Sequence, residues 1–338
     1  MTVSRRFMLA AASALGLATI ALPASAQVAG VPQPVQDCQR ECLEGYVDRY
    51  LAAMANGVVT DDLFARNVRF TENGVELPLG NEGLWATTTG RGTYTLIVPD
   101  VETQNVAALV TVREQASSSA TGPQREPEAV GISLRLKIDS TGRISEVEQI
   151  VARPDRPLGA NAAPVGIFGN TGAMVEAMGA PNPAYLQAVP EAERHTRAEL
   201  VEMASAYFEA VERNTGQDYY PFTDLCIRYE NGIVTAGPEG SGARAGCRQQ
   251  LQTTLIGAVT GIRDRRIVAV DRERGVVFAF AFFDHRPINW SWQLGELFKV
   301  DQGQISHIEA IFIRGPYGIC SGWSTYELCR SEEPQDVR

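Results

Sequence analysis

The feature that most constrains the fold is an internal duplication. Residues 144–153 read ISEVEQIVAR and residues 305–314 read ISHIEAIFIR, with five identical positions in register. Two further echoes occur in the same order along the chain: VRFTENG (68–74) against IRYENG (227–232), which needs one inserted residue, and LKID (136–139) against FKVD (298–301). Three echoes in one order indicate a duplicated unit. Residues that both copies share are therefore expected to be scaffold, and residues special to one copy are candidates for chemistry.

The chain begins with a predicted targeting segment, residues 1–26. Arg5 and Arg6 precede an apolar run, and Ala24-Ser25-Ala26 has the small residues of a cleavage site. The sequence SRRFML also resembles a twin-arginine signal, so Sec and twin-arginine export both remain open. No cysteine stands directly after the cleavage site, and no later apolar stretch is long enough to span a bilayer. We therefore expect an exported, periplasmic protein without a stable membrane anchor.

Length and charge suit a two-domain protein that does not bind nucleic acid. The chain has 338 residues and a formal net charge of −10, with no basic stripe. The predicted domains are a first repeat at 36–153 and a second repeat at 195–318. A Pro/Gly-rich linker at 154–194 separates them, and a C-terminal tail covers 319–338.

An even number of cysteines in an exported chain predicts disulfides. All six cysteines follow the targeting segment, at positions 38, 42, 226, 247, 320 and 329. Cys226–Cys247 is the pairing we expect first, and Cys320–Cys329 would fix the tail. The two remaining cysteines, one helical turn apart, either pair with each other or reach the tail. A four-cysteine metal site is the rival interpretation, although the chain has no C-x-x-C motif.

Each repeat is predicted to open with a long helix. Residues 36–56 and 196–213 place apolar side chains at helical spacing, and Thr196 with Glu199 forms a capping box. Short β-rich segments follow in both repeats. This order predicts an α+β fold in which a curved, mostly antiparallel sheet wraps around helices.

This element order resembles the SnoaL-like, or nuclear-transport-factor-2-like, superfamily. The segments that carry the resemblance are CQRECLEGYVDRYL, RFTENG, DLCIRYENG, FAFAFFDH and PYGICSGW. With both copies included, the mature chain is similar to an uncharacterised bacterial and fungal family built from two such units. The resemblance implies two tandem cone-shaped rolls. It implies no single reaction, because this fold hosts isomerases, cyclases, hydratases, lyases and binding modules.

Several enzyme classes are disfavoured by missing motifs. The chain contains no Gly-x-Ser-x-Gly elbow, no P-loop and no Gly-x-Gly-x-x-Gly after a strand. The only two lysines, Lys137 and Lys299, occupy equivalent positions, which disfavours a Schiff-base mechanism special to one site. Chemistry without a cofactor is therefore the leading expectation.

The terminal hairpin of the second repeat holds the main catalytic candidates. A turn at Gln302-Gly303 that pairs Asp301 with Gln304 would place Glu296 opposite Glu309, beside His307, on the apolar side of the sheet. Apolar surroundings and a neighbouring carboxylate both raise a carboxyl pKa, so such a pair would share one proton and supply a general acid and a general base.

The alternative for this hairpin is structural. Glu309 aligns with Glu148 of the first repeat, so it could be a scaffold residue paired with an arginine such as Arg228, which is aligned with Arg69. A slip of one residue in the hairpin register would also destroy this constellation.

Asp284 and His285, at the end of the strand FAFAFFDH, are candidates for a base and its orienter. A solvated strand end is the alternative, because neighbouring strand residues point to opposite faces. Tyr229 replaces Phe70 of the first repeat and adds a hydroxyl that could steady an oxyanion or relay a proton.

Four residues are candidates for substrate binding: Trp290, Trp292, Arg228 and Tyr220. The two tryptophans could stack on an aromatic ligand or simply fill the core. No ligand spacing demands a metal, so none is expected. The sequence thus predicts a cofactor-independent lyase, dehydratase or isomerase acting on a small hydrophobic, aromatic molecule. The alternative is a non-catalytic binding or scaffold protein. The expected assembly is a monomer or a small homo-oligomer.

Overall fold

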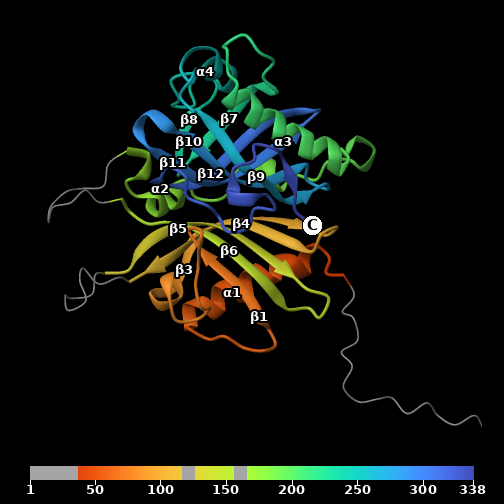
Figure 1. Ribbon diagram of the computed structural model, residues 1–338. Helices are drawn as coiled ribbons and strands as arrows, with labels where there is room; N and C mark the ends of the chain where they lie inside the picture. Colours follow the sequence, from red (N-terminus) through yellow and green to blue (C-terminus); the bar gives the residue numbers. More distant parts are fainter. Residues whose placement is uncertain (1–36, 116–125, 156–165) are drawn as a thin grey trace, which may run out of the picture. The chain divides into compact units, whose positions relative to one another are not determined.

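The protein's structure is a computed structural model that describes residues 37–115, 126–155 and 166–338 (Figure 1). The predicted targeting segment, residues 1–26, lies outside these ranges. The described residues form one compact unit. Within the described residues, no helix is both long enough and apolar enough to cross a bilayer.

The first repeat consists of one long helix and a six-stranded sheet. Its elements are α1 (Arg40–Asn56), β1 (Phe64–Glu72), β2 (Val75–Glu76), the 3-10 helix η1 (Gly83–Ala86), β3 (Thr88–Asp100), β4 (Asn105–Glu114), β5 (Glu128–Ile138) and β6 (Ile144–Ala152). The strand order is β2-β1-β6-β5-β4-β3, and all neighbours are antiparallel except β1 with β6. Helix α1 forms as predicted, because Leu43, Val47, Tyr50 and Met54 recur at helical spacing and are buried.

The second repeat has the same plan with one extra edge strand. Its elements are α3 (Arg197–Glu212), β7 (Phe222–Glu230), β8 (Ile233–Ala236), α4 (Cys247–Thr253), β9 (Gly261–Asp271), β10 (Val276–His285), η5 (Arg286–Ile288), β11 (Trp290–Asp301), β12 (Gln304–Pro316), η6 (Glu327–Cys329) and β13 (Gln335–Asp336). The order is β13-β9-β10-β11-β12-β7-β8, with β7 parallel to β12 and β13 parallel to β9. The capping box of Thr196 and Glu199 opens α3 as predicted. The α+β class is confirmed, with two mixed sheets.

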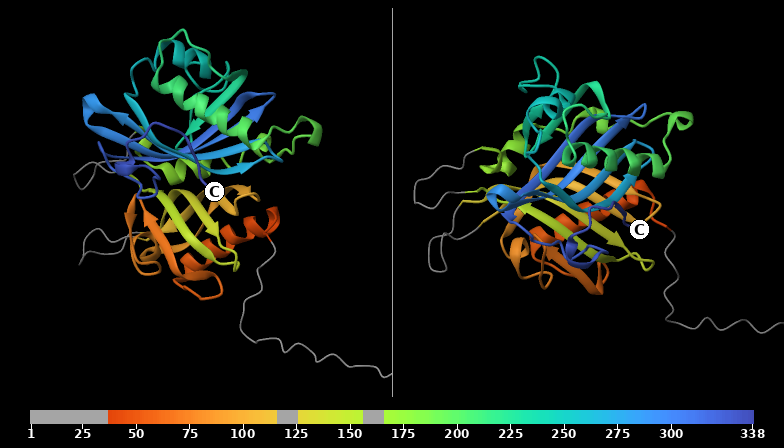
Figure 2. Two further views of the ribbon diagram at one scale, coloured as in Figure 1. Left: turned by 45° about the vertical axis from the view of Figure 1, so that its right-hand side comes forward. Right: turned by 45° about the horizontal axis from the view of Figure 1, so that its top comes forward.

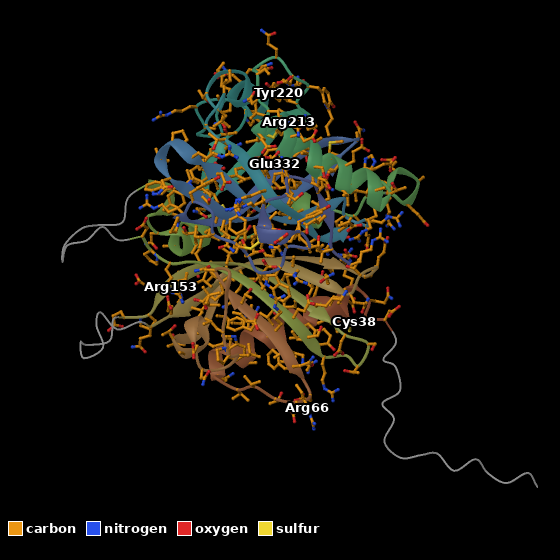
Figure 3. All side chains as sticks on the ribbon, in the orientation of Figure 1. Cys38, Arg66, Arg153, Arg213, Tyr220 and Glu332 are labelled. Carbon is orange, nitrogen blue, oxygen red and sulfur yellow. A yellow bond between two sulfur atoms is a disulfide. The ribbon has the colours of Figure 1, made fainter. Side chains whose placement is uncertain are left out.

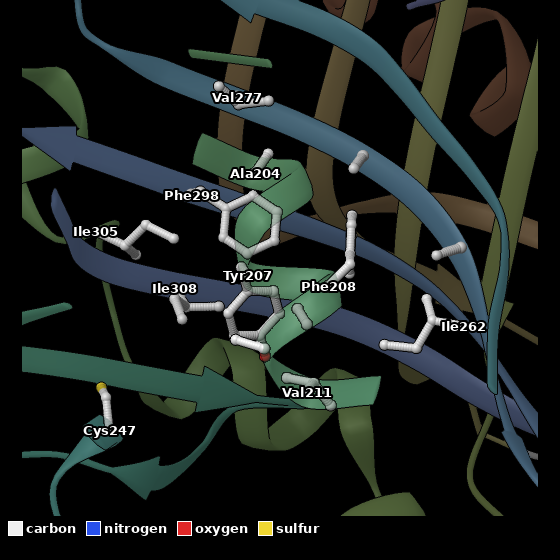
Figure 4. Close-up of a cluster of buried hydrophobic side chains, with 14 of the residues drawn as sticks. Ala204, Tyr207, Phe208, Val211, Cys247, Ile262, Val277, Phe298, Ile305 and Ile308 are labelled. Carbon is white, nitrogen blue, oxygen red and sulfur yellow. The ribbon is translucent and has the colours of Figure 1, made fainter. Parts of the chain in front are cut away.

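Each long helix lies across one face of its own sheet (Figure 2). The core between α3 and the second sheet includes Tyr207, Phe208, Phe298 and Ile308 (Figure 4). We call this side of the second sheet its interior face. The opposite faces of the two sheets pack against each other through a third core, the intersheet core, which contains Tyr94, Leu96, Leu109, Phe278, Phe280, Leu297 and Ile311. Each sheet is therefore covered on both faces.

A β-bulge interrupts the terminal hairpin of the second repeat. Val300 pairs with Ile305, but Lys299 pairs with His307, so Ser306 has no partner on β11. A single extra residue on one strand shifts all later pairings by one and reverses which face each later side chain occupies.

The first repeat carries the same bulge. Ser145 is skipped between β5 and β6 as Ser306 is between β11 and β12. The Ser145 hydroxyl donates to the Lys137 carbonyl at 3.3 Å, and the Ser306 hydroxyl donates to the Lys299 carbonyl at 3.4 Å. The Ile-Ser dipeptide that both copies share therefore marks a β-bulge that occurs in both repeats.

Three disulfides close local loops: Cys38–Cys42, Cys226–Cys247 and Cys320–Cys329. The predicted pairings of the second repeat and the tail are confirmed, and the open choice for the first two cysteines is resolved in favour of pairing with each other. Such a set of disulfides fits an exported protein.

Part of the segment between the repeats is folded against them. It contains η2 (Gly166–Phe168), α2 (Thr171–Ala177), η3 (Pro183–Leu186) and η4 (Glu191–Glu193). Val175 and Tyr185 are buried in the intersheet core. The expected surface linker thus also contributes apolar side chains to the contact between the sheets.

Candidate functional site

The predicted pairing of Glu296 with Glu309 is wrong. Glu296 pairs with Ala310, and Glu309 pairs with Leu297. The bulge at Ser306 causes the difference, because it reverses the alternation of every residue that follows it on β12. Glu296 lies on the interior face and Glu309 on the intersheet face, so the two carboxyl groups cannot share a proton.

Glu309 belongs to an intersheet cluster that also contains Tyr94, Tyr185, Tyr229 and His307. It is 3% exposed, and the Tyr94 hydroxyl donates to Glu309 Oε1 at 2.5 Å. Burial raises the pKa of Glu309 to about 7, although the hydrogen bond from Tyr94 opposes this rise. Tyr229 is the neighbour of Glu309 on β7, and its pKa is raised by burial and by that carboxyl group.

His307 lies two residues before Glu309 on the same face of β12. Its ring packs edge-on against Tyr185 at 5.6 Å, and its Nδ1 lies 3.0 Å from the Ser306 hydroxyl. Burial lowers the pKa of His307. Three predicted catalytic residues, Glu309, His307 and Tyr229, are therefore brought together, but without Glu296.

The equivalent glutamate of the first repeat has a different partner. Both Glu148 oxygens accept hydrogen bonds from the Arg266 guanidinium, at 2.6 and 2.7 Å, and both side chains are 2% exposed. Glu309 thus accepts a hydrogen bond from a tyrosine hydroxyl, whereas Glu148 forms an ion pair with an arginine. The two repeats therefore differ at this position of the intersheet face.

Glu296 belongs to an interior cluster with Tyr207, Arg228 and Glu230. It is 1% exposed, the Tyr207 hydroxyl donates to its Oε1 at 3.0 Å, and its Oε2 has no partner among the described residues. Burial raises the pKa of Glu296 to about 8, and the charge of Glu230 adds to that rise while Arg228 and the Tyr207 hydrogen bond oppose it. The carboxyl group is therefore largely protonated near neutral pH.

Arg228 lies on the interior face, and its predicted equivalence with Arg69 is wrong. The strand pairings match Arg228 to Ile308 and Phe70 to Val147, so Arg228 takes the place of buried Phe70. The predicted replacement of Phe70 by Tyr229 is wrong for the same reason, because Tyr229 takes the place of Thr71. Its Nε donates to Thr235 Oγ1 at 3.1 Å and lies 3.6 Å from Glu230 Oε2, and its Nη2 donates to Gln250 Oε1 on α4. Arg69 is instead partly exposed and stacks on the Trp323 ring.

At two interior positions the second repeat has an ionisable side chain where the first has an apolar one. Glu296 occupies the place of Leu134, because Lys299 and Lys137 sit at matching register positions beside the bulge. Arg228 likewise replaces Phe70. Both first-repeat residues are fully buried apolar side chains. Residues special to one copy are candidates for chemistry. These two substitutions therefore make the interior face of the second repeat the candidate functional site.

Asp284 and His285 do not form a couple. The Asp284 carboxylate accepts from Arg263 Nε at 3.0 Å and from the Ser291 hydroxyl at 2.5 Å. His285 Nδ1 donates to the Ala258 carbonyl at 2.8 Å, and burial lowers the His285 pKa. The two side chains have separate partners, as expected for neighbouring strand residues that point to opposite faces.

The two tryptophans occupy different environments. Trp292 stacks on Phe312 at 5.2 Å and lies 4.3 Å from the His285 ring. Trp290 is 39% exposed, with the Arg314 guanidinium 4.5 Å from its ring centre. Trp292 therefore belongs to the aromatic wall of the interior, and Trp290 to the rim.

Tyr220, labelled in Figure 3, is buried just before β7 and donates its hydroxyl to Asn214 Oδ1 at 2.6 Å. That bond fixes the loop after α3. Within the described parts of the chain, no three His, Cys, Asp or Glu side chains gather closely enough to hold a metal ion.

The sequence did not identify Tyr207 or Tyr94, the residues that hydrogen-bond the two glutamates. Tyr207 lay on the apolar stripe of the predicted helix 196–213 and read as ordinary core. A buried tyrosine needs a partner for its hydroxyl, so a tyrosine on such a stripe is the available signal. Tyr94 had no comparable signal, because its partner lies in the other repeat.

Comparison with known proteins covers mainly the second repeat. Residues 193–312 match a family described as a domain of unknown function (DUF8021). No curated protein matches the chain. The matched region contains both the interior cluster and Glu309.

Proposed function

We propose that this protein is a cofactor-independent lyase, dehydratase or isomerase whose acid–base site is the interior cluster of the second repeat. The observation that carries the proposal is Glu296, a fully buried carboxyl group with one unpartnered oxygen beside Arg228, at positions that are leucine and phenylalanine in the sister repeat. Buried groups with strongly raised pKa values and specific charge partners concentrate at functional sites.

The chemistry follows from the charges in the cluster. Glu296, with a pKa of about 8, would donate a proton near neutral pH. Glu230, beside Arg228, supplies the second carboxylate and would accept one. Arg228 and the Tyr207 hydroxyl would stabilise negative charge that develops on the substrate. Two carboxyl groups in different environments are the usual arrangement for assigning one as acid and the other as base.

The surroundings suit a small hydrophobic, aromatic substrate. Phe298 and Leu294 flank Glu296 on β11, and Ala279 and Ala310 are its small neighbours on the adjacent strands. The same proposal holds that each repeat is a SnoaL-like, cone-shaped roll and that the protein lies in the periplasm. It also holds that the protein is a monomer or a small homo-oligomer.

A non-catalytic binding or scaffold role is the second candidate, and packing favours it. Phe298 lies 4.9 Å from Tyr207 and 5.6 Å from Phe208, so aromatic rings fill the space beside Glu296. Glu296 does not line any of five surface hollows found among the described residues. A substrate would therefore reach Glu296 only if the side chains packed around it moved.

The test is a ligand screen followed by product analysis. Oxidised mature protein would be screened by thermal shift against small aromatic molecules, and ligands that raise the melting temperature would be incubated and analysed by mass spectrometry. We expect wild type to convert one of them, and Glu296→Gln to bind but not convert it. Glu309→Gln is the matched control, because it removes a buried carboxyl group on the opposite face and should keep turnover.

Full turnover by Glu296→Gln would contradict the acid–base site. Ligands that bind and return unchanged would favour the binding role.

A further inference from the structure

A hollow at the open end of the second repeat carries unpaired positive charge. It has a volume of about 460 Å³ and lies where β9 begins and β10 ends. Three arginines line it: Arg263, Arg286 and Arg330. Asp284 and Glu332 are the acidic residues of its lining, so the hollow has an excess of one positive charge in a chain whose formal net charge is −10.

Only one of the three guanidinium groups is neutralised. Arg263 is buried and pairs with Asp284, 3.0 Å away. Arg286 and Arg330 are exposed and make no side-chain hydrogen bond or ion pair with any described residue. Glu212, which also lies near Gly261, already accepts from Arg265 and from the Ile262 N–H.

Two backbone hydrogen bonds hold the walls of the hollow in place. On one side, the Tyr317 N–H donates to the Asn289 carbonyl at 3.1 Å. On the other side, the Asp264 N–H donates to the Ser331 carbonyl at 2.8 Å.

A disulfide and a side-chain contact also fix the tail. The Cys320–Cys329 disulfide closes the segment that links the two sides, and Arg263 Nη1 donates to the Cys329 carbonyl at 3.2 Å. The part of the tail that leads to Glu332 (labelled in Figure 3) is thus fixed against the sheet. The two free guanidinium groups therefore sit on a preformed frame.

We propose that this hollow binds a small oxyanion, a carboxylate or a phosphate group on a small molecule, through Arg286 and Arg330. Guanidinium groups offer forked donors that match both a carboxylate and a phosphate, and neither Arg286 nor Arg330 forms an ion pair with a described residue. The exposed ring of Tyr317 lines the same hollow and offers a surface for the body of the ligand. This site is separate from the interior cluster and does not depend on the proposed reaction.

The test uses calorimetric titration of the oxidised mature protein at low ionic strength with two probes, inorganic phosphate and benzoate. We expect at least one probe to bind. The double variant Arg286→Gln with Arg330→Gln should weaken that binding at least tenfold. The matched control is Arg66→Gln with Arg244→Gln, which removes two exposed arginines outside the hollow and should change affinity less than twofold.

Each outcome decides the proposal. The probe that binds more tightly to wild type identifies the oxyanion class. Absence of binding by both probes would overturn the site. An equal loss in the control variant would overturn it too, because the effect would then come from overall charge. Circular dichroism and melting temperature of both double variants verify that they fold, which is expected since all four side chains are exposed.

Discussion

Replacing Glu309 with glutamine should make the protein more stable at alkaline pH. Glu309 is 3% exposed and faces the intersheet core with one hydrogen bond, from Tyr94. Among the described residues, no arginine pairs with Glu309 as Arg266 pairs with Glu148. Ionising Glu309 therefore places an uncompensated charge between the sheets, whereas glutamine stays neutral and can still accept from Tyr94.

The size of the effect follows from the pKa. The Glu309 pKa is about 7 in the folded protein, against 4.5 for the free side chain. Because the folded pKa is raised, the folded state holds a proton that the unfolded state has lost between these values. The contribution of Glu309 to stability is therefore fully present below pH 4.5 and is lost as pH rises to about 7. At about 1.4 kcal/mol per pKa unit, the loss is about 3 kcal/mol.

The assay is urea unfolding of wild type and Glu309→Gln at about pH 5 and about pH 9 under oxidising conditions. At the lower pH the two proteins should differ by less than about 1 kcal/mol, and at the higher pH the variant should be more stable by about 3 kcal/mol. The difference between the two proteins isolates Glu309 from the other titrating groups.

The sister residue supplies the control. Glu148→Gln leaves Arg266 buried without its bidentate partner, so it should destabilise the protein by about 3 kcal/mol at both pH values. Equal behaviour of the two variants, or a Glu309→Gln protein with the pH dependence of wild type, would refute the reasoning.

Three further outcomes are expected. Glu296→Gln should raise the free energy of unfolding at about pH 9 by about 5 kcal/mol, since the pKa of about 8 lies above 4.5, and urea titration across pH measures the loss of that dependence. Deleting Ser306 should abolish cooperative unfolding because it removes the bulge and reverses the faces of β12, whereas Ser306→Ala should cost about 1 kcal/mol in the same urea assay. Replacing both Cys226 and Cys247 with serine should lower stability by about 3 kcal/mol, because the bridge spans 21 residues, and thermal melting measures it.

Much of the fold could be predicted from local patterns. The helical stripe of α1, the capping box at Thr196 and the spacing of the cysteines each depend on residues close in sequence. The duplication also predicted that both repeats would share one plan. These features need no knowledge of which strands pair across the sheet.

The candidate site could not be predicted to the same extent, because it depends on register. The turn at 302–303 was placed correctly, with Asp301 pairing with Gln304. The bulge two residues later is invisible to an argument from strict alternation. Both repeats contain the dipeptide Ile-Ser, and this repetition is visible in the sequence. A single sequence, however, does not distinguish a serine within a regular strand from a serine at a bulge.

The same limit explains the error at Arg228. Aligning the two Arg residues required an inserted residue, whereas the strand pairings run without one and match Arg228 to Phe70. An alignment that maximises identity therefore hid the most informative difference between the repeats. With the structural register, the second repeat gains a buried arginine and a buried glutamate in exchange for two apolar core residues. Burying such groups costs stability unless they are paired, so a copy that keeps them where its sister has apolar residues is the copy in which function is expected.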